Sequence, residues 1–282
     1  MMKLPVRSIL IGMLVLFAAS ECNLLFGEDA ALTLYITRHT QRGPRSQWPE
    51  ADREKNVIGD LIDGKAVRPK ENSITPLGEE QCRLLGEYLK KLGFRGKVFS
   101  SPTLRTMQTA VCTVRAIDSA IKVIPEPRLQ EGGNRKEPAK GITIAELMKR
   151  FPGNVQEVEL PEYWQYANET TAEHRNARME KFLDDLLKKE TSGQVLLVGH
   201  SSTLPSLFIA INQRMTDKRL VISHYPEYVV NCCLYVYRFD KNGKVIDATL
   251  ENWNYLPEEM QTSNLSPRKK IAPWKKNRYV GK

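Results

Sequence analysis

The sequence predicts an α/β fold, a three-layer α/β/α sandwich with a mostly parallel central sheet. Short apolar runs of strand length recur along the chain, amphipathic helical stretches separate them, and an Asn-Gly hairpin signal lies near the end. Strands that alternate with helices are typical of parallel sheets covered on both faces, and the hairpin adds antiparallel strands at one edge.

The first half of the chain supplies three predicted strands and two predicted helices. An apolar run at 32–37 opens the sheet. A helix follows over 75–93, because a Thr-Pro pair is typical of a helix start and a glycine of a helix end. The short run 98–99 predicts a buried strand, and an apolar stripe over 104–114 predicts a second helix. Alternation over 121–124 predicts the third strand.

The second half begins with an irregular segment, 132–168, which we interpret as a cap-like insertion. Thr143 and Glu146 have the spacing of a capping box and predict one short helix inside it. Apolar residues at helical spacing predict a core-facing helix over 172–189, and another follows residue 203. The remaining predicted strands are 194–198, 229–237 and 245–250, the last two joined by the Asn-Gly turn.

Residues 1–27 are predicted to be a signal peptide and a short linker. Basic residues precede an apolar run, 9–19, that is shorter than the roughly 20 residues needed to span a bilayer. Ala18 and Ser20 supply the small residues that leader peptidases require. We therefore expect export to a periplasmic or extracellular location, with an uncleaved membrane anchor as the alternative.

The positive charge of the chain is concentrated at its end. The net charge is +9, and the stretch from Gln261 onward has no acidic residue and seven basic ones. We expect 259–282 to be a basic C-terminal tail, either solvated or in contact with an anionic surface. Because the rest of the chain is close to neutral, no nucleic-acid partner is expected.

The cysteines beyond the leader match no disulfide framework. They are Cys82, Cys112, Cys232 and Cys233. A disulfide between Cys82 and Cys112, on two predicted helices, and buried free thiols are both compatible with the sequence. Cys232 and Cys233 are expected to point to opposite faces of a strand.

Candidate site residues follow three of the predicted strands. Arg38, His39 and Arg42 come at the end of the first strand, Arg105 shortly after the second, and His200 directly after 194–198. Ligands of open α/β sheets bind outside the carboxyl ends of the strands, so these side chains predict an anion site there.

Glu131 adds a carboxylate to this set. Two histidines, three arginines and one carboxylate are the groups that covalent phosphoryl transfer requires. One histidine attacks phosphorus, the cations hold the phosphoryl oxygens, and the carboxyl group protonates the departing alkoxide.

The chain from about Leu32 to Leu256 resembles the histidine phosphatase superfamily, also called phosphoglycerate mutase-like. The matching stretches are, in order, LYITRHTQR, ITPLGEEQ, FSSPTLRTMQTA, PRLQEGG, VLLVGHSSTL and VVNCCLYVYRFD. Branch 1 of the family fits better than the acid phosphatase branch, because Ser201 follows His200 where that branch has a His-Asp pair.

The resemblance implies a phosphoglycerate mutase-like fold and a phosphomonoester hydrolase that acts on a small molecule through a phosphohistidine. It implies that His39 is the nucleophile, Glu131 the general acid and His200 the second catalytic histidine. The implied phosphate ligands are Arg38, Arg42, Arg105 and His200. The corresponding catalytic domain spans 28–258 and includes the insertion.

Two expectations accompany this mechanism. The carboxyl group must be protonated when the leaving group departs, so we expect the activity to fall as the pH rises. The four histidines lack metal-ligand spacing and the arginines supply positive charge, so we expect no metal ion and no cofactor.

Thr40 stands where the family's motif usually has glycine. A β-branched residue with a positive φ would be strained, so the backbone after His39 is a point to check in the structure.

Two other functions fit parts of the sequence. A phosphoglycerate mutase-type phosphoryl transferase would use the same residues, although an export signal argues against a cytoplasmic mutase. An α/β-hydrolase esterase would use Ser201 as the nucleophile of a strand-elbow-helix motif.

The aromatic residues Trp48, Tyr163, Trp164 and Tyr166 either cover the leaving group or pack the insertion on the core. The physiological substrate and the oligomeric state are not predicted.

Overall fold

The computed structural model describes residues 30–43, 60–62, 65–67, 73–132, 140–164, 169, 171–215, 217 and 229–261. The predicted leader, most of the predicted basic tail, and Trp48 and Tyr166 lie outside these ranges, so the predictions that concern them stay predictions. No helix in the described ranges has the length and hydrophobicity needed to cross a bilayer.

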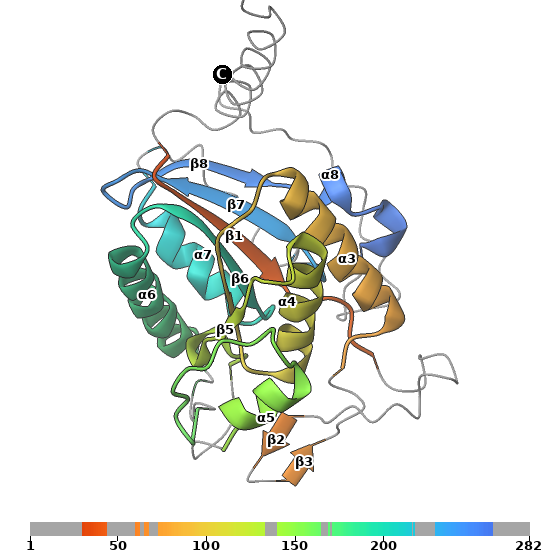
Figure 1. The fold of residues 1–282 in the computed structure, drawn as a ribbon. Coiled ribbons are helices and arrows are strands. Elements are labelled where there is room, and N and C mark those ends of the chain that lie inside the picture. The colour runs from red at the N-terminus through yellow and green to blue at the C-terminus, as the bar shows by residue number, and fades with distance from the viewer. Residues whose placement is uncertain are drawn as a thin grey trace, which may run out of the picture.

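A six-stranded sheet with helices on both faces forms the centre of the molecule (Figure 1). Its strands, in spatial order, are β5 (Val123–Pro125), β4 (Lys97–Ser100), β6 (Gly193–Gly199), β1 (Leu32–Arg38), β7 (Leu234–Phe239) and β8 (Val245–Leu250). The first four are parallel, while β7 and β8 pair antiparallel. The mostly parallel sandwich predicted from the sequence is therefore confirmed.

The two faces of the sheet carry separate apolar clusters. Along β1, Leu34 and Ile36 pack toward α6 (Ala172–Lys189) and α7 (Leu204–Asn212). Tyr35 packs on the other face toward α3 (Pro76–Lys91) and α4 (Leu104–Ile117). Side chains of a strand alternate between faces, so a strand covered on both sides is apolar along most of its length.

The helix boundaries follow the local signals in the sequence. Thr75 accepts a hydrogen bond from the Gly78 amide, which caps α3, and Gly93 has a φ of 72° just after the helix. The predicted capping box forms at α5 (Ile144–Arg150). Shorter elements are β2 (Asp60–Ile62), β3 (Lys65–Val67), η2 (Pro127–Leu129), α8 (Asn252–Tyr255) and η4 (Glu258–Met260). The hairpin of β2 and β3 was not expected from the sequence.

The strand predicted over 229–237 is wrong in its first part. β7 begins at Leu234, and the chain turns at Asn231 and Cys232 instead. The Asn231 carboxamide and the Cys232 amide bond to carbonyls of residues 38–40, at the end of β1 and just after it, and these bonds take the place of ladder pairing. Cys232 and Cys233 thus precede β7 rather than lying within a strand, but they belong to the apolar clusters on opposite faces of the sheet, as expected.

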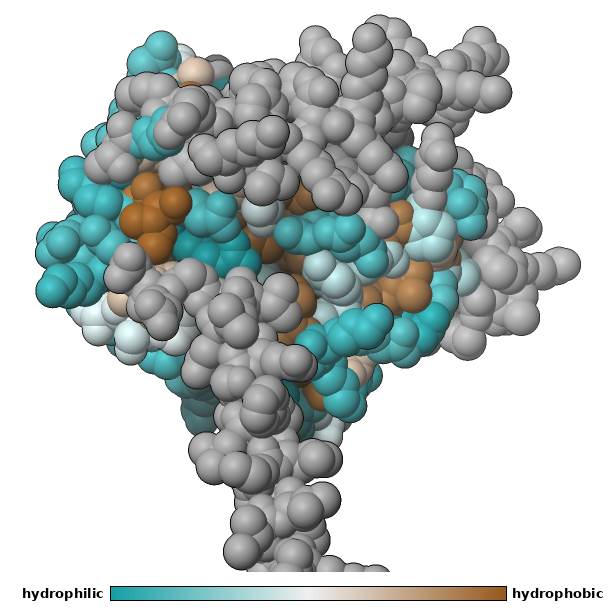
Figure 2. Space-filling model, turned by 90° about the horizontal axis from the view of Figure 1, so that it is seen from above, coloured by the Kyte–Doolittle hydropathy of each residue, from teal (hydrophilic) through white to brown (hydrophobic). Residues whose placement is uncertain are grey.

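The surface that can be described is largely polar. Seen from above in Figure 2, hydrophilic residues dominate the coloured surface and apolar residues form small separate groups. In the described ranges the large apolar side chains that remain exposed are Met148, Tyr163, Ile209 and Ile246.

At Gly86, α3 packs closely against α4. A Cβ atom there would lie 2.5 Å from both the Ala116 Cβ and the Thr113 carbonyl oxygen. Alanine in place of a helical glycine usually stabilises by about 1 kcal/mol, but overpacking costs about 1–3 kcal/mol. We expect Gly86→Ala to lower the free energy of unfolding measured in urea. The exposed control Glu87→Ala should change it by less than about 0.5 kcal/mol. An alanine variant as stable as the wild type would contradict this packing.

Candidate active site

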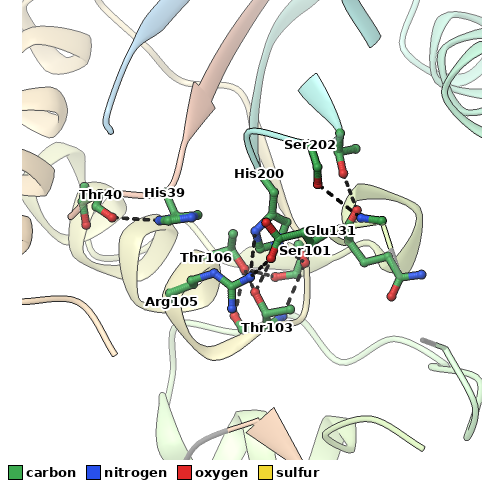
Figure 3. A network of polar contacts seen from close by, with 12 residues as sticks. His39, Thr40, Ser101, Thr103, Arg105, Thr106, Glu131, His200 and Ser202 are labelled. Carbon is green, nitrogen blue, oxygen red and sulfur yellow. Dashed lines mark hydrogen bonds and ion pairs between the residues drawn. The ribbon is translucent and has the colours of Figure 1, made fainter. Parts of the chain in front are cut away.

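The strand order brings three candidate segments together at one edge of the sheet. β6 lies between β4 and β1, so the residues that follow these three strands are neighbours, although they are far apart in the sequence. Arg38 pairs with Gly199 in the ladder, and the His39 amide donates to the Gly199 carbonyl at 3.0 Å. The imidazole rings of His39 and His200 consequently lie with their centroids 5.4 Å apart (Figure 3).

The hydrogen bond of the His39 ring defines its tautomer. Its Nδ1 lies 2.8 Å from the Thr40 carbonyl oxygen, which can only accept, so Nδ1 carries the proton. In the neutral ring the lone pair is then on Nε2. The ring extends from Thr40 toward Arg105 and His200 in Figure 3.

Thr40 fits the position after His39 without a left-handed backbone. In the described ranges Cys232 alone among the non-glycine residues has a positive φ. The backbone at position 40 therefore does not require a glycine. The Thr40 amide donates to Thr109 Oγ1 at 3.1 Å, and its own Oγ1 lies 3.2 Å from the same atom. Thr109, on α4, therefore anchors the residue whose carbonyl accepts the hydrogen bond from His39 Nδ1.

Arg38 and Arg42 bring positive charge close to His39. Arg38 is buried, and its Nη1 donates to the Val229 carbonyl at 2.8 Å. Its Nε has no hydrogen-bond partner in the described structure, so this donor can serve an incoming anion. Burial lowers the pKa of Arg38 to about 10, which leaves it cationic at neutral pH. The charge of Arg42 also acts on Arg38, His39 and His200.

Arg105 connects the second histidine to the carboxylate. It lies in the first turn of α4, and its Nη2 is 2.7 Å from Glu131 Oε2 and 3.2 Å from His200 Nδ1 (Figure 3). Its side chain is buried, whereas that of Glu131 is 41% exposed. The arginine is thus held in the site and the carboxyl group reaches it from the solvent side.

The opposite nitrogen of His200 faces hydroxyl groups. Because a guanidinium only donates, His200 Nδ1 accepts from Arg105, and Nε2 then carries the proton of the neutral ring. Nε2 lies 3.0 Å from Ser101 Oγ and 3.3 Å from Thr103 Oγ1. The two buried histidines therefore carry their protons on opposite nitrogens.

The segment that carries Glu131 is fixed by side chains of two helices and a turn. The Gly132 amide donates to Ser202 Oγ at 3.3 Å, and Thr203 Oγ1 donates to the Gln130 carbonyl. Arg178 of α6 donates to the Arg128 carbonyl and forms a buried two-pronged ion pair with Glu169. These contacts limit the positions that the Glu131 carboxyl group can take.

Burial keeps both histidines uncharged. It is the largest cause that lowers the pKa of His39 well below 6.5, and the charges of Arg38 and Arg105 add to it. Burial also lowers the pKa of His200, again with help from Arg105. A neutral His39 at physiological pH is what a nucleophile requires.

The structure brings together all the site residues predicted from the sequence, although it does not test their roles. His39, Arg105, Glu131 and His200 are linked by the distances given above, and Arg38 and Arg42 act through their charges. No cluster of three or more His, Cys, Asp or Glu side chains suited to a metal ion occurs among the described residues. Trp164 is buried, donates to the Ile142 carbonyl within the insertion, and belongs to the apolar cluster beneath α3 and α4, so it packs the insertion on the core.

Sequence reasoning missed Asn231. Its carboxamide nitrogen lies 3.1 Å from the carbonyl oxygens of both His39 and Thr40, but the surrounding apolar residues predicted a continuous strand. The available signal was an amide side chain inside an apolar run, because buried polar groups need hydrogen-bond partners.

Comparison with known proteins identifies a family. The sequence profile of the histidine phosphatase superfamily (branch 1) matches residues 58–252, more than half of the chain. The match includes Arg105, Glu131 and His200 and begins after His39, so the placement of His39 rests on the structure. No protein of curated function matches the sequence significantly.

Solved structures are similar in fold. Ecdysone phosphate phosphatase from Bombix mori, crystallised with tungstate, is 23% identical with a TM-score of 0.51, covering 76% of this chain and 92% of its own. A phosphoserine phosphatase mutant from Entamoeba histolytica with phosphoserine is 16% identical with a TM-score of 0.46, covering 80% and 100%. At these identities the likeness concerns the fold alone.

The lowered histidine pKa values predict acid sensitivity of the folded state. Below about pH 6.5 an unfolded histidine binds a proton that His39 and His200 do not bind in the folded protein. Stability must then fall with falling pH, by up to about 1.4 kcal/mol per pH unit for each ring. We expect the melting temperature to decrease between about pH 6.5 and 5. The double variant His39→Asn/His200→Asn should flatten this dependence, and the exposed control His174→Asn should keep it. An unchanged slope in the double variant would refute the assignment.

Proposed function

Because the chain belongs to branch 1 of the histidine phosphatase superfamily, we propose that it hydrolyses small phosphomonoesters through a phosphohistidine on His39. The observation that carries this proposal is the hydrogen bond from His39 Nδ1 to the Thr40 carbonyl. It leaves the lone pair on Nε2 in a ring whose pKa is lowered by burial and by neighbouring arginines. A nucleophile in this state needs no separate base to activate it.

The first step transfers the phosphoryl group to the enzyme. His39 Nε2 attacks phosphorus and forms the N–P bond while the bond to the ester oxygen breaks. Arg38, Arg42 and Arg105 hold the phosphoryl oxygens, on which charge is spread in the transition state. Glu131 gives its proton to the departing oxygen, so an alcohol leaves and a carboxylate remains.

Substrate binding rearranges the Arg105–Glu131 ion pair. Arg105 Nη2 donates to Glu131 Oε2, and an incoming phosphoryl group competes for the same donor. Displacement frees the carboxyl group and places it beside a negatively charged ligand. Negative charge nearby favours the neutral carboxyl form, which is the form that can protonate the leaving group.

The second step returns the enzyme to its starting state. The Glu131 carboxylate takes a proton from water, and the resulting hydroxide-like oxygen attacks the phosphorus of the phosphohistidine. The N–P bond breaks, inorganic phosphate is released, and the lone pair returns to His39 Nε2. The positive charge that the His39 ring carries while phosphorylated is stabilised by the Thr40 carbonyl at 2.8 Å from Nδ1.

Replacing the nucleophile tests the covalent step. We expect His39→Ala to lose the acid-labile phosphoryl label that a radioactive phosphomonoester leaves on the wild type, and to lower kcat to near background. His174→Ala, an exposed histidine on α6, is the matched control and should keep both. Activity should persist in excess chelator, and the product should be inorganic phosphate rather than an isomerised ester. A persistent phosphoenzyme in the alanine variant would overturn the assignment.

Replacing the proton donor should affect substrates according to their leaving groups. An aryl phosphate departs without protonation, whereas an alkyl phosphate needs a proton at its ester oxygen. We expect Glu131→Gln to keep an initial burst of about one equivalent of phenol and then turn over slowly. Its kcat on an alkyl phosphate should fall by about 10²–10⁴-fold without a burst.

The control for this experiment is Glu162→Gln, an exposed carboxylate of the insertion that pairs with Lys140. It should leave both reactions unchanged. Equal losses of Glu131→Gln on both substrates in the first turnover would show that Glu131 does not act as the general acid.

A further inference from the structure

We propose that Asn231 is a positioning residue that sets the tautomer of His39. This inference rests on the proposed function, because the tautomer matters only if His39 Nε2 attacks phosphorus. Asn231 precedes β7 and is fully buried. It is not one of the residues whose charge or proton the reaction uses.

The contact is made by one side-chain group with two carbonyls. Asn231 Nδ2 lies 3.1 Å from the carbonyl oxygen of His39 and 3.1 Å from that of Thr40. An amide nitrogen has two protons, and these match the two acceptors. The Thr40 carbonyl is also the acceptor of the His39 Nδ1 proton at 2.8 Å. Asn231 thus holds the oxygen atom that selects the protonated nitrogen of the nucleophile.

The backbone conformation next to Asn231 positions its carboxamide beside the two carbonyls. Cys232 has a φ of 57°, a left-handed conformation that costs a non-glycine residue about 1–2 kcal/mol. The Cys232 amide lies 3.3 Å and 3.4 Å from the carbonyls of Arg38 and His39, and the Tyr255 hydroxyl donates to the Cys232 carbonyl. Strain of this kind persists where surrounding contacts over-determine it, and it is concentrated at functional sites.

The chemical consequence concerns which nitrogen is nucleophilic. A free neutral imidazole side chain favours the proton on Nε2, which would place the lone pair on Nδ1, on the wrong side of the ring. A fixed carbonyl next to Nδ1 reverses this preference. Without the Asn231 amide the Thr40 carbonyl loses this donor, and the peptide that follows Thr40 is held less firmly, through the Gln41 amide that donates to Gln81 Oε1 at 2.7 Å. A smaller fraction of His39 then presents a lone pair at Nε2. The loss should appear in kcat, because the arginines that bind phosphate are unchanged.

Asn231→Leu removes the donor with little change in side-chain shape. We expect the imidazole ¹⁵N spectrum of wild-type His39 to show one tautomer, protonated at Nδ1, and that of the variant to show a mixture. We expect kcat to fall by about 10- to 100-fold with KM within about threefold. The control is Asn252→Leu, a fully buried asparagine whose Oδ1 accepts from the Leu234 amide. It should keep the wild-type tautomer and kcat even if its stability falls.

Asn231→Asp provides a second measurement, which a purely structural role of Asn231 would not affect. A neutral aspartic acid can donate one hydrogen bond to these carbonyls, whereas an aspartate can donate none. The ratio of its kcat to that of the wild type should therefore rise as the pH falls. This variant also keeps the proposal testable if Asn231→Leu does not fold.

The outcomes separate the inference from the proposed function. A folded Asn231→Leu variant with the wild-type tautomer and kcat, or a pH-independent activity ratio for Asn231→Asp, overturns the inference. Failure of wild-type His39 to carry a phosphoryl group would overturn the proposed function instead. The tautomer measurement needs no substrate, so it remains interpretable in either case.

Discussion

The neutral, buried imidazole of His39 is the constraint on which the rest of the site depends. Burial and the charges of Arg38 and Arg105 disfavour its protonation, so the ring reaches the site with a lone pair. A buried ring must also satisfy its remaining N–H group, and the Thr40 carbonyl does so at 2.8 Å. The same environment that leaves the His39 ring uncharged thus determines which of its two nitrogens carries the lone pair.

The order of the strands in the sheet places the residues of the site next to one another. β6 lies between β1 and β4, and parallel pairing aligns the residues that leave these strands at one edge. His39 and His200 are neighbours because their strands are neighbours, and Arg105 reaches both His200 and Glu131 from the first turn of α4. Apolar residues on both faces hold the strands in register, so core packing and site geometry depend on each other.

The sequence predicted the regular parts of the molecule well. Apolar runs, the Thr75–Pro76 helix start and the capping box at Thr143 gave the right elements, because these signals are local. The placement of His39, Arg105, Glu131 and His200 at strand or helix ends was also recognisable. Asn231 was not, because its carboxamide bonds to residues about 190 positions earlier, and these long-range bonds replace the first part of a predicted strand. The tautomers of the two histidines likewise depend on contacts that no local pattern encodes.

The ion pair between Arg105 and Glu131 bears on how this site could be inhibited. Arg105 pairs with the Glu131 carboxylate, so an oxyanion ligand that binds Arg105 must compete with a contact of 2.7 Å. A compound with an ammonium group a few bonds from its oxyanion would satisfy both partners of the broken pair. Zwitterionic phosphonates are therefore a better starting point for inhibitors than simple anions, whose net affinity is reduced by the cost of separating the two residues.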